Sequence, residues 1–272
     1  MSMTAPVARQ GSVVPLRFGL IGEHIAYSAS PAIMSAAFAA LGLPHAYGLI
    51  DVPEAEVPSA VEALRRPGAG GANVTTPHKR LVASLMDELS PDAERTGAVN
   101  CVVPREGRLI GHNTDLPALI AQVTALRPDG PERAVVLGGG GAAGAVSLAL
   151  EDAGAREVVS LTRSGGTWGR MLDELARADM VVNATPIGTG SDETPVPAEL
   201  HRPDLAVLDL VYRPSPTRLV REARAVGAPA RAGGGMLLGQ AIRSLESWLG
   251  VPAPVTAMRD ALVTSVGSGV DA

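Results

Sequence analysis

The chain has 272 residues, of which 46% are hydrophobic and 19% are charged, and its formal net charge is -5. This composition is too apolar for a disordered chain, and the length suggests about two domains. The negative net charge and the 3% of aromatic residues argue against nucleic-acid binding, and the single cysteine, Cys101, excludes an intrachain disulfide and a Cys-x-x-Cys metal site.

No apolar run is long enough for a signal peptide or a membrane span. We therefore expect a cytoplasmic protein with a loose tail over residues 1–15. Its partners should be small molecules, with neither nucleic acid nor membrane among them, and the protein should be a monomer or a homodimer.

Short apolar runs alternate with helical stretches in the first half of the chain. We expect strands over residues 16–21, 46–50 and 72–75, and helices over 31–41, 53–65 and 77–85. Runs at 98–104 and 109–111 flank Arg105–Arg108 and predict a β-hairpin, which a helix over 115–127 follows. This alternation is typical of an α/β domain with a mostly parallel sheet.

The same alternation starts again after a Pro- and Gly-rich break at 127–131. We expect strands over 134–137, 158–161, 180–182 and 206–210, and helices ending near 153 and over 168–178 and 217–226. This order predicts a Rossmann-type doubly wound domain. A bend at Gly233–Gly235 precedes helices over 236–249 and 254–264. We place a substrate domain at 1–116, a nucleotide-binding domain at 117–236, and helices that return to the first domain at 237–272.

A glycine-rich turn follows the first strand of the second half. Residues 138–143 read Gly-Gly-Gly-Gly-Ala-Ala, a G-x-G-x-x-A pattern between a strand and an Ala-rich helix. Glycines let the backbone approach a pyrophosphate, and the helix N-terminus attracts its charge, so a dinucleotide is predicted here. Arg163 follows the next strand, where an acidic residue would bind the ribose of NAD, and it favours NADP. The alternatives are a glycine-rich loop without a ligand and an ordinary surface arginine.

Only one of the 23 basic residues is a lysine, Lys79, and lysine, unlike arginine, can give up its proton. Asn73 and Thr75 precede it at a strand end and would point the same way, toward one polar ligand. Asp115 begins a later helix. It is either the cap or a first-turn acid of that helix, or it pairs with Lys79 in acid/base chemistry. Ser30 precedes a proline, and we interpret it as a helix cap whose hydroxyl also binds the ligand.

The remaining rare polar residues allow two further interpretations. The histidines show no metal-binding spacing, so we predict no metal site and interpret them as loop residues or as hydrogen-bonded polar residues. The chain has only four asparagines, which we expect where another residue would fail. These two sets are His24, His45, His78, His112 and His201, and Asn73, Asn100, Asn113 and Asn183.

In combination, these motifs resemble those of the shikimate dehydrogenase family from about Phe18 to Leu262. The matching segments are Gly22–Pro31, Gly71–Lys79, Gly97–Asn100, Asn113–Asp115, Gly138–Ala142, Thr162–Ser164, Asn183–Gly188, Asp209–Pro214 and Gly235–Gln240. The chain departs from the family's usual residues at four positions: Tyr27 and Met34 replace histidines, Leu116 replaces a glycine and Thr162 replaces an asparagine.

The resemblance implies NADPH-dependent reduction of 3-dehydroshikimate to shikimate, with Lys79 and Asp115 as the acid/base pair. It also implies that Ser28 and Ser30 hold the substrate carboxylate, that Thr75, Asn100, Asp115 and Gln240 hold its hydroxyls, and that Tyr212 closes the pocket. The implied contacts with NADP(H) are Gly138, Gly139, Gly140, Gly141, Ala142, Thr162, Arg163, Ser164, Thr185, Leu210 and Gly233. Closure near 115–117 and 233–235 should exclude water.

Three other functions stay open at this point. A dehydrogenase acting on quinate, on both quinate and shikimate, or on an amino-substituted analogue would share the reactive residues. A paralogue could bind NADP without catalysis. A folate-linked dehydrogenase has a similar two-domain layout, but the Ser28 and Ser30 motif would have no role in it.

Overall fold

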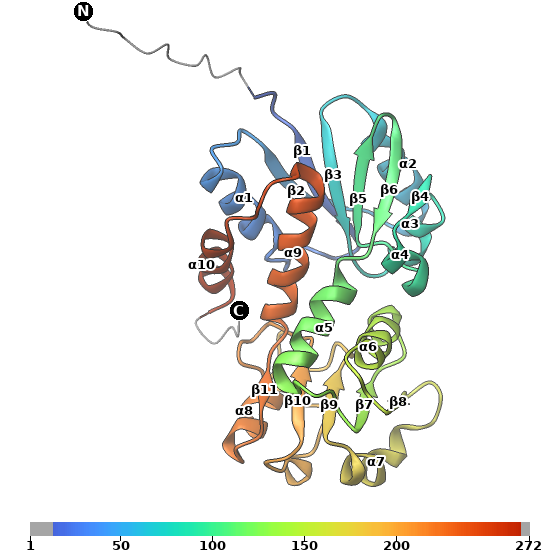
Figure 1. The fold of residues 1–272 in the computed structure, drawn as a ribbon, viewed down its shortest axis with the longest axis vertical. Coiled ribbons are helices and arrows are strands. Elements are labelled where there is room, and N and C mark those ends of the chain that lie inside the picture. Colours follow the sequence, from blue (N-terminus) through green and yellow to red (C-terminus); the bar gives the residue numbers. More distant parts are fainter. Residues whose placement is uncertain (1–12, 268–272) are drawn as a thin grey trace, which may run out of the picture.

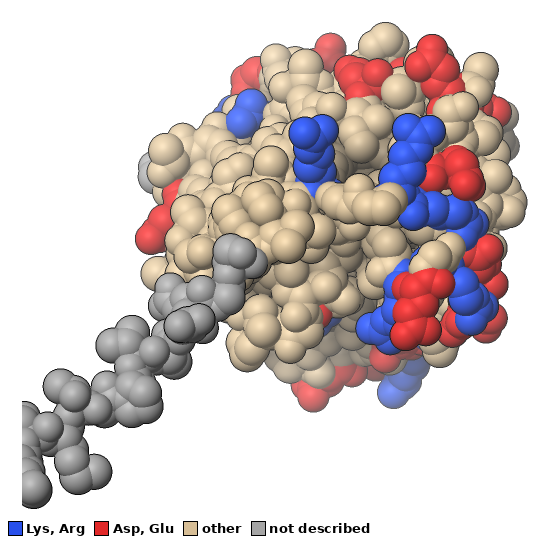
Figure 2. All heavy atoms as spheres, turned by 90° about the horizontal axis from the view of Figure 1, so that it is seen from above, with Lys and Arg blue, Asp and Glu red and all other residues tan. Residues whose placement is uncertain are grey.

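Two β-sheets, one in each half of the chain, organise the computed structural model (Figure 1). The structure describes residues 13–267, so most of the predicted tail over 1–15 lies outside the described residues, and 13–15 form neither helix nor strand. No helix within the described range is long and apolar enough to cross a membrane. On the face seen in Figure 2, acidic and basic side chains lie interspersed at the periphery of a broad uncharged area.

The first sheet has six strands in the order β2-β1-β3-β5-β6-β4. They are β1 (Arg17–Gly22), β2 (Ala46–Asp51), β3 (Ala69–Val74), β4 (Glu88–Leu89), β5 (Cys101–Arg105) and β6 (Arg108–His112). β5 runs antiparallel to β3 and β6, and the other neighbouring strands are parallel. The predicted hairpin around 105–108 is therefore confirmed as β5 and β6.

Helices cover both faces of this sheet. They are α1 (Ser30–Ala40), α2 (Val57–Glu62), α3 (Lys79–Ala83), α4 (Pro91–Thr96), α9 (Gly234–Leu249) and α10 (Val255–Val266). Side chains alternate along β1, so Phe18 and Leu20 pack with α1, α9 and α10, whereas Ile21 packs with α2 and α3. The C-terminal helices thus pack on the first sheet, although the domain limits at 116, 117, 236 and 237 stay predictions.

Several predicted helix limits in the first half were wrong. The expected helix over 53–65 is broken into two short 3-10 turns, Glu54–Glu56 and Ala63–Arg65, on either side of α2. Pro58 explains the first break, because a proline is favoured in the first turn of a new helix. β4 and α4 were not predicted, although Ser90 caps α4 by accepting a hydrogen bond from the Ala93 N–H.

The second sheet has five parallel strands in the order β11-β10-β9-β7-β8. They are β7 (Arg133–Leu137), β8 (Glu157–Leu161), β9 (Met180–Asn183), β10 (Ala206–Asp209) and β11 (Ala230–Arg231). One face packs against α5 (Asp115–Leu126) and α6 (Gly141–Asp152), and the other against α7 (Met171–Arg177) and α8 (Arg218–Ala225). This arrangement confirms the doubly wound fold. Two 3-10 turns, Trp168–Arg170 and Ala198–Leu200, lie between strands.

The strand order determines where a ligand can bind in this half. The chain proceeds from β7 to one neighbour, β8, and then crosses to the other, β9, so a crevice opens at their carboxyl ends. The glycine-rich turn lies there, directly after β7. The bend predicted at Gly233–Gly235 was misplaced, because α9 already begins at Gly234. Gly233 is needed there for a close approach: a Cβ on it would lie 2.1 Å from the Leu210 carbonyl oxygen.

Candidate active site

Lys79 and Asp115 form an ion pair at the carboxyl edge of the first sheet. Lys79 begins α3 after β3, and Asp115 begins α5 after β6, so the sheet brings two residues together that are 36 positions apart. The Lys79 Nζ lies 2.6 Å from the Asp115 Oδ2. The Asp115 side chain is 9% exposed and that of Lys79 25%, so water has only limited access to the pair.

The backbone of α5 leaves the Asp115 carboxylate free for this contact. Asn113 Oδ1 accepts hydrogen bonds from the N–H groups of Asp115 and Leu116, at 3.1 and 3.0 Å. Asn113 therefore satisfies the first turn of the helix. Asp115 does not cap α5, but it is the acidic residue of the first turn, as the alternative interpretation allowed. The Asn113 amide also donates to Thr96 Oγ1 and to the Ala98 carbonyl, which fixes the start of α5 against the first sheet.

The serine pair at the start of α1 also differs from its predicted geometry. Ser30 is the first residue of the helix rather than its cap, and the cap position is Ala29, without a side-chain hydrogen bond. Ser28 Oγ instead accepts a hydrogen bond from the Ser30 N–H at 3.2 Å, and the two hydroxyl oxygens are 3.2 Å apart. The Ser30 hydroxyl is therefore not used for capping.

All eight predicted catalytic and substrate-binding residues line one small cavity of about 160 Å³. They are Ser28, Ser30, Thr75, Lys79, Asn100, Asp115, Tyr212 and Gln240. Asn100 Oδ1 accepts from the Thr114 N–H at 2.6 Å, and Gln240 Nε2 donates to the Leu237 carbonyl, so both amides have a determined orientation. Burial, reinforced by the nearby Tyr27 phenol, raises the pKa of Tyr212, whose hydroxyl therefore stays protonated and able to donate.

Asn73 does not contribute to the cavity, and its predicted role beside Thr75 was wrong. It does face the same side of the sheet as Thr75, but α9 covers it there. Its amide donates to Ser244 Oγ at 2.8 Å and to the Asn100 carbonyl, and its Oδ1 accepts from the Tyr47 hydroxyl. Asn73 thus supports the floor beneath the cavity instead of contacting a ligand.

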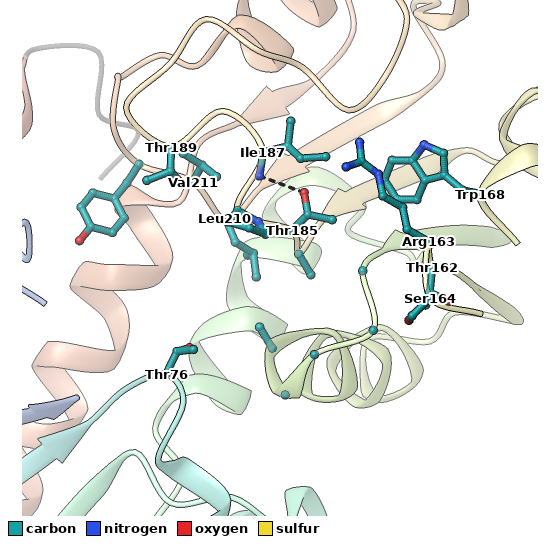
Figure 3. Close-up of a pocket in the computed structure, with 18 of the residues that line it drawn as sticks. Thr76, Thr162, Arg163, Ser164, Trp168, Thr185, Ile187, Thr189, Leu210 and Val211 are labelled. Carbon is teal, nitrogen blue, oxygen red and sulfur yellow. Dashed lines mark hydrogen bonds between the residues drawn. The ribbon is translucent and has the colours of Figure 1, made fainter. Parts of the chain in front are cut away.

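A second cavity, of about 690 Å³, follows the carboxyl edge of the second sheet (Figure 3). Ten of the eleven predicted cofactor residues line it: Gly138, Gly139, Gly140, Gly141, Ala142, Thr162, Arg163, Ser164, Thr185 and Leu210. Gly233 lines the small cavity instead. Sequence reasoning did not single out Ile187, although it lies within the matching segment Asn183–Gly188. It also missed Trp168, which lies in none of the matching segments.

The glycine-rich turn has the form that a dinucleotide pyrophosphate requires. Gly138 has a φ of +127°, which side chains disfavour, and its Cβ would lie 3.0 Å from the Ala184 carbonyl oxygen. A Cβ at Gly140 or Gly141 would meet no atom within 4 Å, so the backbone there borders open space. The N–H groups of Gly141 and Ala142, the first two residues of α6, precede the first hydrogen bond of the helix, which the Ala143 N–H makes to the Gly140 carbonyl, and they are available to an anion.

The two cavities adjoin each other between the two sheets. Tyr27, Leu210 and Tyr212 line both of them, and the larger cavity also takes Thr76 from the first half of the chain. A dinucleotide in the large cavity and a small molecule in the other would therefore lie side by side. This arrangement suits a transfer between cofactor and substrate.

Of the histidines, His201 lies in a loop, as one of the two interpretations allowed, but it is not hydrogen-bonded. Its side chain is buried, and neither ring nitrogen has a hydrogen-bond partner among the described residues; the nearest acid is Glu222, with Oε2 at 3.9 Å. Burial lowers the pKa of His201 and keeps the ring neutral. His78 is hydrogen-bonded as expected, through the Val52 carbonyl. Residues 13–267 contain no group of three or more His, Cys, Asp or Glu side chains that could hold a metal ion.

Comparison with known proteins identifies the family. Models of the shikimate dehydrogenase substrate binding domain and of the shikimate 5′-dehydrogenase C-terminal domain match residues 20–102 and 233–263. A protein from Rubrobacter xylanophilus, described as shikimate dehydrogenase (NADP(+)), is 43% identical over 90% of this chain and 94% of its own length. The chain belongs to the shikimate dehydrogenase family.

Solved structures of shikimate dehydrogenases and their relatives share the whole fold. Shikimate 5-dehydrogenase from Thermus thermophilus, in complex with NADP(H) and shikimate, is 36% identical, with a TM-score of 0.81 over 92% of this chain and 99% of that one. Quinate dehydrogenase from Corynebacterium glutamicum, in complex with NAD, is 29% identical, with the same TM-score and coverage. Since one fold supports both activities, residues of the site must decide between them.

Proposed function

We propose that this protein catalyses the reversible, NADPH-dependent reduction of 3-dehydroshikimate to shikimate. The observation that carries the proposal is the contact between Lys79 and Asp115 inside a small cavity that adjoins a dinucleotide-shaped one. A titratable amine held by a carboxylate can exchange a proton with a ligand oxygen, and such assistance contributes about 10²–10⁴ in rate.

The small cavity offers a polar group for each part of this substrate. Ser28, Ser30 and Tyr212 present hydroxyls near one another, and in the proposal they donate hydrogen bonds to the carboxylate. Thr75, Asn100 and Gln240 hold the ring hydroxyls, together with Asp115.

In the proposal, Lys79 donates a proton to the ketone oxygen as that oxygen becomes a hydroxyl, and accepts it back in the oxidation. Asp115 orients the amine through the 2.6 Å contact and balances its charge. The site lies between the two sheets, so closure of the two halves would exclude water from this proton transfer.

The larger cavity fits NADP(H), which supplies the hydride for the reduction. The turn at Gly138–Ala142 and the N-terminus of α6 would hold the pyrophosphate, and Arg163, flanked by Thr162 and Ser164, would hold the 2′-phosphate. Thr185 and Leu210 continue the lining toward the small cavity, where Gly233 lies.

Quinate oxidation is the second candidate function. It stays the alternative because Tyr27, which departs from the family's usual histidine, lines both cavities and is 53% exposed. The guanidinium of Arg163 supports NADP rather than NAD for either substrate.

Three coarser features complete the proposal. We assign the substrate domain to 1–116, the NADP-binding domain to 117–236 and the returning helices to 237–272. We place the protein in the cytoplasm, since its single cysteine, Cys101, is buried and forms no disulfide. As a monomer or homodimer, it would act on small molecules alone.

The proposal is tested by following nicotinamide absorbance with shikimate and quinate, each with NADP and NAD. We expect turnover of shikimate with NADP to exceed the other three combinations. A preference for quinate or for NAD would contradict the substrate or the cofactor assignment, respectively. No turnover with any pair would contradict catalysis and favour a paralogue that only binds NADP.

A further inference from the structure

One end of the larger cavity carries an indole ring beside its arginine. The Arg163 Cζ lies 5.0 Å from the centre of the Trp168 ring, within the distance at which a guanidinium and an aromatic face attract each other. Figure 3 shows the two side chains next to each other at this end, with Thr162 and Ser164 beside them. No motif in the sequence pointed to Trp168.

Packing against the core and a closed loop hold Trp168 in place. It begins a 3-10 turn, is half-buried, and packs against the hydrophobic core formed by β7, β8, α7 and their neighbours. The loop between the two residues is closed by Thr162 and Thr167: the Thr162 N–H donates to Thr167 Oγ1 at 2.8 Å, and the Thr167 N–H donates to the Thr162 carbonyl. The indole is therefore a fixed platform rather than a mobile surface group.

Arg163, by contrast, is exposed and needs support from elsewhere. It forms no ion pair with a carboxylate among residues 13–267. The only other basic side chain among the described lining residues, Arg213, donates to the Ser265 carbonyl. A long free side chain loses rotamer entropy when it binds a phosphate, and a prior contact with a ring reduces that loss.

We propose that Trp168 is a positioning residue that holds the Arg163 guanidinium for a 2′-phosphate and thereby increases the preference for NADP over NAD. The inference rests on the proposed function, because it assumes that an adenine dinucleotide occupies this cavity. Trp168 acts through Arg163, so its removal should matter only for ligands that carry the 2′-phosphate.

The test uses the full chain and two cofactor fragments, adenosine 2′,5′-bisphosphate and adenosine 5′-monophosphate, with affinities measured by calorimetry. Trp168→Leu keeps apolar bulk against the core but removes the aromatic face, whereas Trp168→Phe keeps a face. We expect the Leu variant to weaken the bisphosphate about two- to fivefold and leave the monophosphate unchanged. The Phe variant should retain most of the affinity. In the enzyme assay, KM for NADP should rise while kcat and the KM for NAD stay unchanged.

A double-mutant cycle separates positioning from a general structural role. In the Arg163→Ala background, Trp168→Leu should cause no further loss of bisphosphate affinity. Equal weakening of both fragments by Trp168→Leu would overturn the inference, because the ring would then contact the adenine itself. Additive losses of bisphosphate affinity in the cycle would also overturn the inference. Failure of the unaltered protein to bind either fragment would overturn it as well. Since fragment binding needs no turnover, failure of the shikimate assay alone would contradict the proposed function and not this inference.

Discussion

At the scale of single residues, scarcity marks the positions where chemistry or geometry leaves no substitute. The only lysine forms the ion pair of the small cavity. The four asparagines are all buried, and each uses its amide to join separate segments, as Asn100 does with Thr114 and Asn113 with Ala98. An amide has two donor hydrogens and an acceptor oxygen on separate atoms, whereas an ionised carboxylate only accepts and a hydroxyl donates only once, so neither could make the same bonds.

Replacement of the lysine gives the clearest prediction at this scale. Lys79→Met keeps the approximate length of the side chain but removes the titratable amine that exchanges the proton, so turnover should fall by about 10²-fold or more. NADPH affinity, measured by fluorescence titration, should stay nearly unchanged, because Lys79 does not line the larger cavity. Lys79→Arg is the matched control: it keeps the charge beside Asp115 but cannot release a proton, so it should be almost as inactive. Normal turnover in either variant would rule out the proposed proton transfer.

At the scale of elements, the strand ends of the second sheet are tied together by a buried carboxylate. Asp209, the last residue of β10, accepts hydrogen bonds from Asn183 at the end of β9, from the Val211 N–H and from the Thr217 hydroxyl. Two loops that line the cofactor cavity are thus held at a constant spacing. Burial nevertheless raises the pKa of Asp209 to about 6, because these bonds only partly replace water.

This raised pKa predicts a pH dependence of stability. Between about pH 4 and 6 the folded protein holds the Asp209 proton more tightly than the unfolded chain, so this residue's contribution to stability falls as the pH rises through that window. Asp209→Asn has no such loss. Urea titrations at pH 4 and pH 7 give the free energy of unfolding of both proteins. The value for the variant, relative to that of the unaltered protein, should therefore rise by up to about 3 kcal/mol between these two pH values. A difference that stays constant with pH would contradict the assignment.

At the scale of the whole molecule, the two sheets face each other across the cavities and are connected on one side by α5 and α9 (Figure 1). A second link lies between α4 of the first half and α6 of the second. Arg95 there donates two hydrogen bonds to Asp152, at 2.7 and 2.9 Å. The pair is exposed at 46% and 28%, so it adds little stability, but any separation of α4 from α6 would break it.

We expect Arg95→Ala to lower the free energy of unfolding by less than about 1 kcal/mol. The same variant should lower kcat/KM a few-fold, because the two halves that line the cavities lose one of the contacts that hold them in this arrangement. The charge-exchanged double variant Arg95→Asp with Asp152→Arg should recover most of that loss. Activity that the exchange does not restore would mean that the two residues act separately.

Much of the fold could be predicted from local pattern. The alternation of apolar strands and helices, the hairpin at 105–108 and the glycine-rich turn after β7 each depend on neighbouring residues. Short elements escaped prediction where tertiary contacts supply most of their stability, as in the two-residue strands β4 and β11. The helix over 53–65 failed for a local reason, because Pro58 starts a new helical segment within it.

Some features of the candidate site could likewise be predicted from the sequence, and others could not. The residue types at Lys79 and Asp115, and the glycines at 138–141, follow from sequence because the chemistry requires those side chains or their absence. Three-dimensional contacts decided the rest: Asn113 rather than Asp115 satisfies α5, α9 covers Asn73, and Trp168 lies against Arg163. Sequence by itself determined which groups this protein has available, since that depends on composition and local spacing. Only the tertiary structure decided which of them meet, because hydrogen bonds between distant segments depend on packing that no local pattern encodes.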